Sequence, residues 1–370
     1  MSFQPPQRVL MGPGPADVPN RILHALAKPT IGHLDPAFGV LMEEIKQLLR
    51  YGFQTKNDLT IPLSAPGSAG MECCFVNLVE PGDTVIVCQN GAFGARMREN
   101  VERCGATPVM VMDDWGAAIN PQKLEDALKS HPEAKAVALV QAETSTGVLS
   151  DVETLCALAH AHDCLTIVDA VTSLGGSELR VDDWKIDAVY SGTQKCLSCP
   201  PGLSPVSFSP RAVDVISRRK TKVQSWFLDL NLVMDYWTSD GPRTYHHTAP
   251  INALYGLHEA LLILQEEGLE NAWQRHQTGH EKLCQGLNDI GLELLVKPED
   301  RLPQLNSVLV PSHITDEAAL RRRLLDQFNL EIGAGLGELA GKVWRIGLMG
   351  HSCRNENIQT CIQALKTVLN

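Results

Sequence analysis

Two side chains that can do chemistry follow short apolar segments in the middle of the chain. Asp169 comes directly after the apolar run LTIV, and Lys195 comes soon after IDAVYSG, within residues 191–202, SGTQKCLSCPPG. The 26 positions between them are about what one strand–helix–strand crossover needs, so we expect both to face one cleft. A carboxylate can hold a protonated nitrogen, and a lysine amine can bond covalently to a carbonyl carbon and carry a proton.

A loop of small residues supplies a third element, an expected anion site. Residues 65–70 read APGSAG and lead into an amphipathic helical pattern. Free backbone N–H groups at such a helix start bind anions, and Ser68 can add a hydroxyl. Because the loop matches neither common nucleotide motif, a single phosphomonoester is favoured. Together with Asp169 and Lys195, this loop describes a pocket for pyridoxal phosphate.

Other reactive residue types in the chain have plainer explanations. An aspartate after a strand is often a cap or turn residue, and an isolated lysine is usually solvated. Cys196 and Cys199 form a CxxC, but no second pair or histidine stands at the spacing of a zinc site, so we interpret them as small residues lining a turn. His246 and His247 are adjacent, and we interpret them as structural. No metal site is expected.

The elements that must position these side chains follow a strand–helix alternation. Short apolar runs bounded by turns predict strands buried on both faces. Amphipathic segments between them predict helices, with starts at Asn120, before Pro121, and at Asp151. The fold class is therefore α/β, a mostly parallel sheet flanked by helices, with ligands at the carboxyl ends of the strands. The expected strands are 84–88, 108–112, 135–140 and 165–168.

After about residue 250 the pattern changes. One long helical pattern begins at Asn252, continues past Gly279, and leads into a smaller α+β unit. We expect an N-terminal arm over 1–20, a large cofactor-binding α/β domain over 21–260 and a small C-terminal domain over 261–370. In the small domain, SVLVP and KVWRIGLM are strand-like, and DEAALRRRLLDQF and NENIQTCIQALKTVL are helical.

The composition limits the possible partners and compartments. The chain has 370 residues, 44% hydrophobic and 20% charged, as in an ordinary globular protein. A net charge of -11 offers no basic surplus, so we expect neither nucleic acid nor a membrane as partner. The first residues lack the features of a secretory signal, and the last carry no peroxisomal address, so we expect a cytoplasmic enzyme whose eleven cysteines are reduced.

The chain resembles the class V aminotransferases of fold type I, specifically the alanine–glyoxylate and serine–pyruvate aminotransferases. The matches are long, occur in order and cover nearly the whole chain. They are LMGPGPADVP, LVEPGD, NGAFGAR, ETSTGVL, VDAVTSLGG, SGTQKCLSCPPG, RTYHHTAP, EEGLENAW and KVWRIGLMG.

The resemblance implies a role in cofactor binding for each matched residue. Lys195 would form the Schiff base with pyridoxal phosphate, and Asp169 would hold the pyridine nitrogen. Phe93 stands where close relatives stack a tryptophan on the cofactor ring. The remaining contacts within the chain would come from Gly67, Ser68, Thr144 and Gln194.

The resemblance also implies shared active sites and a substrate clamp. Tyr245 and Thr248 would reach the cofactor phosphate of a neighbouring subunit, which implies an obligate homodimer. Arg345 would bind the substrate carboxylate, a task suited to a bidentate guanidinium. His33 and Gly14 are expected on the substrate side of the site.

The implied activity is ping-pong transfer of an amino group from a small amino acid, alanine or serine, to glyoxylate. GHLDPAF, GTQKCLS and WRIGLMGHSCRNEN resemble the ureidoglycine–glyoxylate aminotransferases, but that group typically has a glutamine at His33 and an asparagine at Tyr245. A site lacking those amides should reject the ureido substrate, which favours the small donor. The sequence is also compatible with a kynurenine or 3-hydroxykynurenine transaminase, and more remotely with a cysteine desulfurase-like lyase or a non-enzymatic ligand-binding protein.

Overall fold

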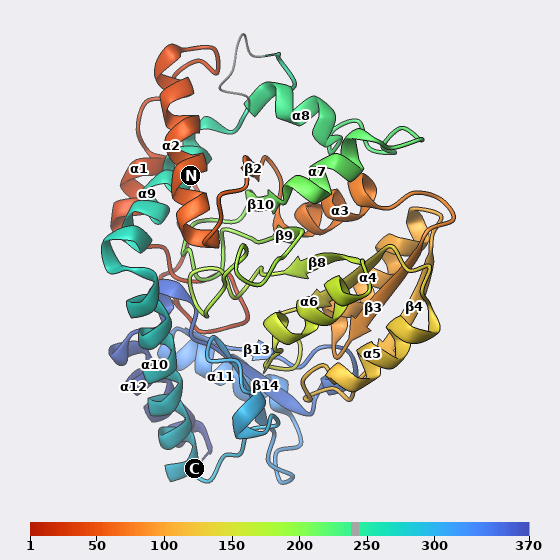
Figure 1. Ribbon diagram of the computed structural model, residues 1–370. Helices are drawn as coiled ribbons and strands as arrows, with labels where there is room; N and C mark the ends of the chain where they lie inside the picture. The colour runs from red at the N-terminus through yellow and green to blue at the C-terminus, as the bar shows by residue number, and fades with distance from the viewer. Residues whose placement is uncertain (238–243, 370) are drawn as a thin grey trace.

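The computed structural model describes residues 1–237 and 244–369, and these residues fold around a seven-stranded sheet (Figure 1). The strand order is β2-β10-β9-β8-β5-β3-β4, and β10 runs in the direction opposite to the other strands. The predicted mostly parallel sheet is therefore confirmed. The strands are β2 (Leu59–Leu63), β3 (Thr84–Gln89), β4 (Thr107–Met112), β5 (Ala136–Val140), β8 (Leu165–Asp169), β9 (Ala188–Tyr190) and β10 (Ser204–Phe208).

Helices connect the strands of the sheet from β2 to β8 and form layers on it. The expected helix between Asp169 and Lys195 is absent from this described part of the chain, since the connection from β8 to β9 consists of turns. The helices α3 and α4 contact each other and the sheet, and α5 and α6 form a second contacting pair. Right-handed crossovers place connections that run in opposite directions along a parallel sheet on opposite faces. The helices of this part are α3 (Gly67–Leu78), α4 (Ala92–Arg103), α5 (Pro121–Ser130), α6 (Val152–Ala161), α7 (Pro210–Ser217) and α8 (Leu230–Trp237); a short hairpin pairs β6 (Ala142–Glu143) with β7 (Val148–Leu149).

The predicted helix starts and strands match the structure closely. The Asn120 side chain accepts from Gln122 N at 2.9 Å, with Pro121 in the first helical position, and Asp151 accepts from Thr154 N at 3.1 Å. The four predicted strands correspond to β3, β4, β5 and β8. The prediction of burial on both faces is wrong for β4, which is the edge strand and is largely half-exposed.

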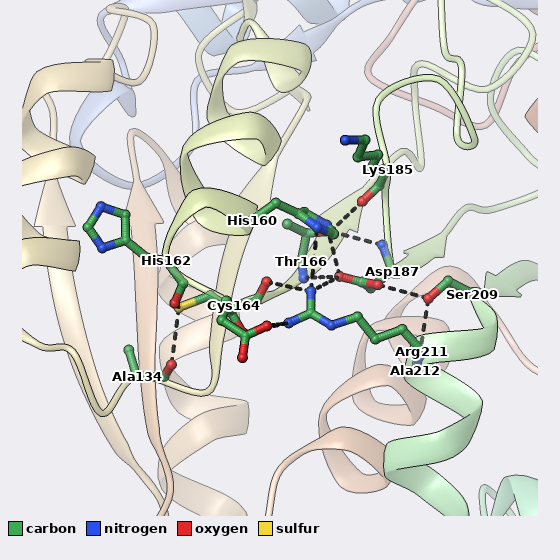
Figure 2. A network of polar contacts seen from close by, with 11 residues as sticks. Ala134, His160, His162, Cys164, Thr166, Lys185, Asp187, Ser209, Arg211 and Ala212 are labelled. Atoms are coloured by element: carbon green, nitrogen blue, oxygen red, sulfur yellow. Dashed lines mark hydrogen bonds and ion pairs between the residues drawn. The ribbon is translucent and has the colours of Figure 1, made fainter.

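A polar network connects the N-terminal ends of β8 and β9 with the C-terminal end of β10 (Figure 2). The buried Asp187 carboxylate, just before β9, accepts from Thr166 N at 3.1 Å and from Ser209 Oγ at 2.8 Å. It also forms an ion pair with Arg211 at 3.4 Å, and His160 Nε2 lies 3.2 Å from it. Because Thr166 is the second residue of β8 and Ser209 follows β10, this carboxylate holds three neighbouring strand ends in register.

The long helical pattern predicted from Asn252 is two helices, so the prediction of one continuous helix is wrong. The chain breaks at Gly268, whose φ of 83° is costly for other residues, and α9 and α10 meet there. Figure 1 shows the two helices one above the other along one side of the molecule. The bounds of these two helices and of the others not yet given are α1 (Asn20–Leu26), α2 (Pro36–Phe53), α9 (Ile251–Glu267), α10 (Leu269–Asp289), α11 (Glu317–Phe328) and α12 (Asn355–Leu369).

The C-terminal part has its own small sheet and core. The strands β11 (Leu305–Leu309), β14 (Val343–Gly347) and β13 (Gly333–Ala334) form it, while β1 (Val9–Leu10) pairs with β12 (Leu330–Glu331). Three 3-10 turns lie at Pro298–Asp300, Gly337–Leu339 and Gly350–Ser352.

Among the described residues, two large buried hydrophobic cores underlie this organisation, and a smaller third cluster includes Ala16, Cys196 and Leu305. One core extends from Ile22 to Ala272, and the other combines Met11 with residues from Leu283 to Val368. The residues of the predicted N-terminal arm thus contribute to the C-terminal core. The domain boundaries at 20 and 260 stay predictions. Within the described ranges, none of the helices combines the length and the apolar character that crossing a bilayer requires.

Candidate active site

A cavity of about 210 Å³ lies at the carboxyl ends of β8 and β9 and the start of α3. This is where ligands bind in open α/β sheets. A larger hollow of about 380 Å³ lies on the other side of the Lys195 turn, but neither Lys195 nor Asp169 lines it. Seven of the predicted site residues line the smaller cavity, and their roles stay predictions: Gly67, Ser68, Phe93, Thr144, Asp169, Gln194 and Lys195.

Asp169 ends β8 as a buried carboxylate. It accepts hydrogen bonds from Val171 N and from the Tyr190 hydroxyl, both at 2.8 Å. Burial raises the pKa of this carboxyl to about 6, against the opposing effect of the two hydrogen bonds. The sequence analysis missed Tyr190, although its place as the last residue of the neighbouring strand was a usable signal.

Lys195 lies in the turn after β9, and its amine donates to the Pro13 carbonyl oxygen. Burial lowers the pKa of the amine to about 8, and the nearby Arg345 acts in the same direction, whereas Asp169 opposes it. The neutral, nucleophilic form of the amine is therefore more populated near neutral pH than in a solvated lysine. Gly14 lies against this amine, because a Cβ at that position would be 2.6 Å from Nζ.

The start of α3 presents the expected anion site. The Pro66 carbonyl accepts from Ala69 N at 2.8 Å and Gly70 N at 3.4 Å. Among the described residues, no backbone acceptor meets the N–H groups of Gly67 and Ser68. Pro66 is the residue before the helix, so its missing N–H removes none of these donors.

Phe93 and Gln194 form other parts of the cavity wall. Phe93 lies in the first turn of α4, and the Arg96 guanidinium is 4.8 Å from the centre of its ring. The buried Oε1 atom of Gln194 has no hydrogen-bond partner among the described residues. This oxygen atom is a hydrogen-bond acceptor at the cavity wall and is available to a donor group of a bound ligand.

The remaining predicted residues lie beside the cavity or outside it. The Arg345 guanidinium donates to Ala334 O at 2.7 Å and to Thr144 O at 3.1 Å, which places it next to the cavity wall. The rings of His33 and Tyr245 are 5.4 Å apart. The Tyr245 hydroxyl is 3.3 Å from Thr248 Oγ1, and both residues are exposed rather than part of the cavity of their own chain.

The cysteine and histidine pairs fit the structural interpretation. Burial raises the pKa of Cys196 and of Cys199 to about 12, so both stay as thiols at neutral pH. His247 Nε2 lies 2.7 Å from Ser64 Oγ, and His246 Nδ1 lies 2.8 Å from His247 Nδ1. These contacts pack the segment after residue 243 against the end of β2.

Comparison with known proteins identifies the family. The sequence profile of Aminotransferase class-V matches residues 14–356. An alanine–glyoxylate aminotransferase of Oryctolagus cuniculus is 41% identical over 98% of this chain and 93% of that protein. An (S)-ureidoglycine–glyoxylate transaminase of Bacillus subtilis is 38% identical over 98% of this chain and 91% of that protein.

A solved structure gives the same answer for the fold. The crystal structure of an alanine–glyoxylate aminotransferase from Nostoc sp. has a TM-score of 0.97 and 47% identity, covering 100% of this chain and 97% of that one. The chain therefore belongs to the class V aminotransferases and has the fold type I architecture. Membership implies a transaminase that depends on pyridoxal phosphate.

The residues of the cavity fit this cofactor. The two free N–H groups at the start of α3 and the Ser68 hydroxyl match a phosphate, and the buried Asp169 carboxylate matches a protonated ring nitrogen. Lys195 supplies an amine on the same cavity, and Gln194 supplies a side-chain amide there. At Gly67 a Cβ would lie only 3.3 Å from Ser191 O, which explains a glycine in this wall.

Proposed function

We propose that this protein transfers the amino group of a small amino acid, alanine or serine, to glyoxylate, using pyridoxal phosphate bound in the 210 Å³ cavity. The observation that carries the proposal is the Lys195 amine facing the same cavity as the buried Asp169 carboxylate and the free N–H groups of α3. The 41% identity to an alanine–glyoxylate aminotransferase over 98% of the chain supports the choice of substrates.

Each residue of the cavity then has a defined task. Gly67, Ser68 and Gln194 hold the phosphate, Phe93 stacks on the ring, Thr144 contacts the cofactor, and Asp169 keeps the ring nitrogen protonated. When bound, pyridoxal phosphate supplies an aldehyde that condenses with amines and a ring that takes up electron density. Burial of Asp169 makes its ionised form costly, so a positive partner at its oxygen atoms is stabilised there.

Lys195 holds and moves the proton of the reaction. Its amine, with a pKa of about 8, takes the proton from the substrate α-carbon and returns it. Arg345 binds the substrate carboxylate. Its Nε and Nη1 atoms donate to Ala334 O and Thr144 O, which fixes the plane of the guanidinium. Gly14 keeps space beside the amine for the incoming substrate.

Ureidoglycine is the second candidate donor, supported by the 38% identity to the Bacillus subtilis transaminase. His33 and Tyr245 argue against it. Their rings pack 5.4 Å apart and offer no amide group to a ureido substituent. A polar substrate group that finds no partner in a site binds poorly, so the smaller donor is preferred.

The assembly that we propose is a homodimer in the cytoplasm. Tyr245 and Thr248 do not line the cavity of their own chain, and in a dimer they would reach the phosphate of the partner. Large apolar side chains are exposed beside these residues: Leu34, at 74%, follows His33, which packs on Tyr245; Trp226, at 62%, stacks on His246; and Tyr245 itself is 60% exposed. A second copy would cover them. The net charge of -11 gives no basis for binding nucleic acid or an anionic membrane.

A donor screen with glyoxylate and pyruvate as acceptors tests the proposed reaction. Alanine and serine should turn over faster than ureidoglycine and hydroxykynurenine. Lys195→Ala should keep weak cofactor binding and lose at least about a thousandfold in turnover, because one group supplies both the covalent link and the proton transfer. Faster turnover with ureidoglycine than with alanine or serine would show that ureidoglycine is the donor. Near-normal turnover of Lys195→Ala would show that the proposed mechanism is wrong.

A further inference from the structure

Glu143 is a fully buried carboxylate beside the cavity that neither the sequence analysis nor the proposed reaction uses. It ends β6 and accepts three hydrogen bonds. The donors are Phe93 N at 3.1 Å, Ser145 N at 3.0 Å and Ser145 Oγ at 2.5 Å. A carboxylate held in this way is stabilised in a defined position.

These bonds replace the missing cap of α4. The residue before the helix is Gly91, which has no side chain to bind the first N–H groups. Instead Ala92 N donates to Ser145 Oγ at 2.9 Å, and Phe93 N donates to Glu143. A Cβ at position 91 would collide with the Glu143 carboxyl group, so the glycine leaves room for this cap from another strand.

The same short turn also holds the substrate clamp. Between Glu143 and Ser145, the Thr144 carbonyl accepts from Arg345 Nη1 at 3.1 Å. One turn of three residues therefore contacts the backbone of Phe93 on α4 and the guanidinium of Arg345 on β14. A shift of this turn moves both.

Burial raises the pKa of Glu143 to about 7, assisted by the charge of Asp169 and opposed by the three hydrogen bonds. The charged and titratable groups that interact with it are Asp169 on β8, Tyr190 on β9 and Arg345 on β14. From α4 it meets only the backbone N–H of Phe93, over whose ring the Arg96 guanidinium lies.

We propose that Glu143 is a positioning residue that couples Phe93 to Arg345 and so sets the distance between the ring-stacking and carboxylate-binding sides of the site. The ionised carboxylate offers all its lone pairs to the three donors, and protonation converts one oxygen into a donor and weakens the cap. The cap should therefore loosen as the pH falls through about 7. The cap itself is independent of any ligand, whereas its effect on the site rests on the proposed function.

The test compares Glu143→Gln, Ser145→Ala and a matched control, Glu102→Gln, which removes an exposed acid of α4 that pairs with Arg98. Amide hydrogen exchange of the segment around Ala92 and Phe93 is measured in the full chain without cofactor, at several pH values. In Glu143→Gln we expect exchange at least about tenfold faster than wild type at pH 8, with the ratio falling toward one at pH 6, because the wild-type carboxyl is then protonated. Ser145→Ala should speed exchange at Ala92, and Glu102→Gln should change nothing.

The coupling is then measured in the protein with pyridoxal phosphate. Glu143→Gln should weaken cofactor binding and raise the KM for the amino donor, about tenfold each. Phe93→Leu should weaken mainly cofactor binding, and Arg345→Lys should raise mainly the KM. Unchanged exchange in Glu143→Gln overturns the proposal, and if that variant does not fold, unchanged exchange in Ser145→Ala overturns it. A wild type that binds no pyridoxal phosphate would instead defeat the proposed function and leave the exchange result valid.

Discussion

Tyr190→Phe tests whether Asp169 holds its charge for a ligand. The substitution removes the hydroxyl that donates to Asp169 Oδ2 at 2.8 Å and leaves the ring packed. A hydrogen bond to a charged group contributes about 1.5–3 kcal/mol. Because one pKa unit corresponds to about 1.4 kcal/mol, the pKa of Asp169, about 6 in the wild type, should rise by about one to two units.

The consequence is a pH-dependent loss of cofactor affinity. At pH 7 about nine tenths of Asp169 is ionised in the wild type, and about a half to a tenth in Tyr190→Phe. The dissociation constant for pyridoxal phosphate at pH 7 should therefore rise about twofold to tenfold, while the two proteins should converge at pH 9. Titration of the cofactor-free protein from pH 5.5 to 9 measures this.

The control is Tyr255→Phe, which removes a hydroxyl that donates to Pro29 O at 3.2 Å, outside the cavity. It should bind the cofactor like the wild type at every pH. The phosphate of the cofactor also titrates near pH 6, but equally with all three proteins, so the difference between them reports on Asp169. If cofactor affinity falls at the same pH in Tyr190→Phe and in the wild type, the reasoning is refuted.

Three further predictions concern different parts of the molecule. Gly14→Ala should weaken cofactor binding about tenfold, since its φ is 99° and the new Cβ would meet the lysine amine; affinity titration checks this. Arg211→Met should lower the free energy of unfolding by about 2 kcal/mol in urea and leave the KM unchanged, because it strips Asp187 of its cation at the far edge of the sheet. Asp169 and Glu143 have pKa values of about 6 and about 7 in the folded protein without cofactor, so they keep protons that the unfolded chain has already released. The free energy of unfolding should therefore fall as the pH rises from 4 to 7. Urea unfolding of the Asp169→Asn and Glu143→Gln variants at pH 5 and 7 should show a smaller loss than wild type.

Local signals predicted much of the framework. The apolar runs located β3, β5 and β8, and caps such as Asn120 located helix starts, because each depends on neighbouring residues. Asp169 and Lys195 were predictable as partners for the same reason. A polar residue at the end of a buried strand, followed one crossover later by another, places both at one edge of a parallel sheet.

Contacts between distant segments were not predictable in this way. Tyr190, Glu143 and the Pro13 carbonyl each act on a residue that is 21 or more positions away in the chain. Their importance depends on which strands are neighbours, and periodicity does not specify this. The break at Gly268 has a different cause, since an apolar pattern continues across it and only the backbone conformation ends the helix.

The two ends of β8 and β9 show why one edge of the sheet is the functional one. At the far edge, the buried Asp187 forms an ion pair with Arg211, so its charge has a cation within the fold. At the cavity edge, Asp169 is equally buried, yet within the described ranges no lysine, arginine or histidine lies at ion-pair distance from it. An ionised buried carboxylate without a cation beside it costs stability, and a cation that arrives at its oxygen atoms removes that cost. Its retention next to an amine and free N–H donors is the mark of a site built for a ligand with a positive and a negative group.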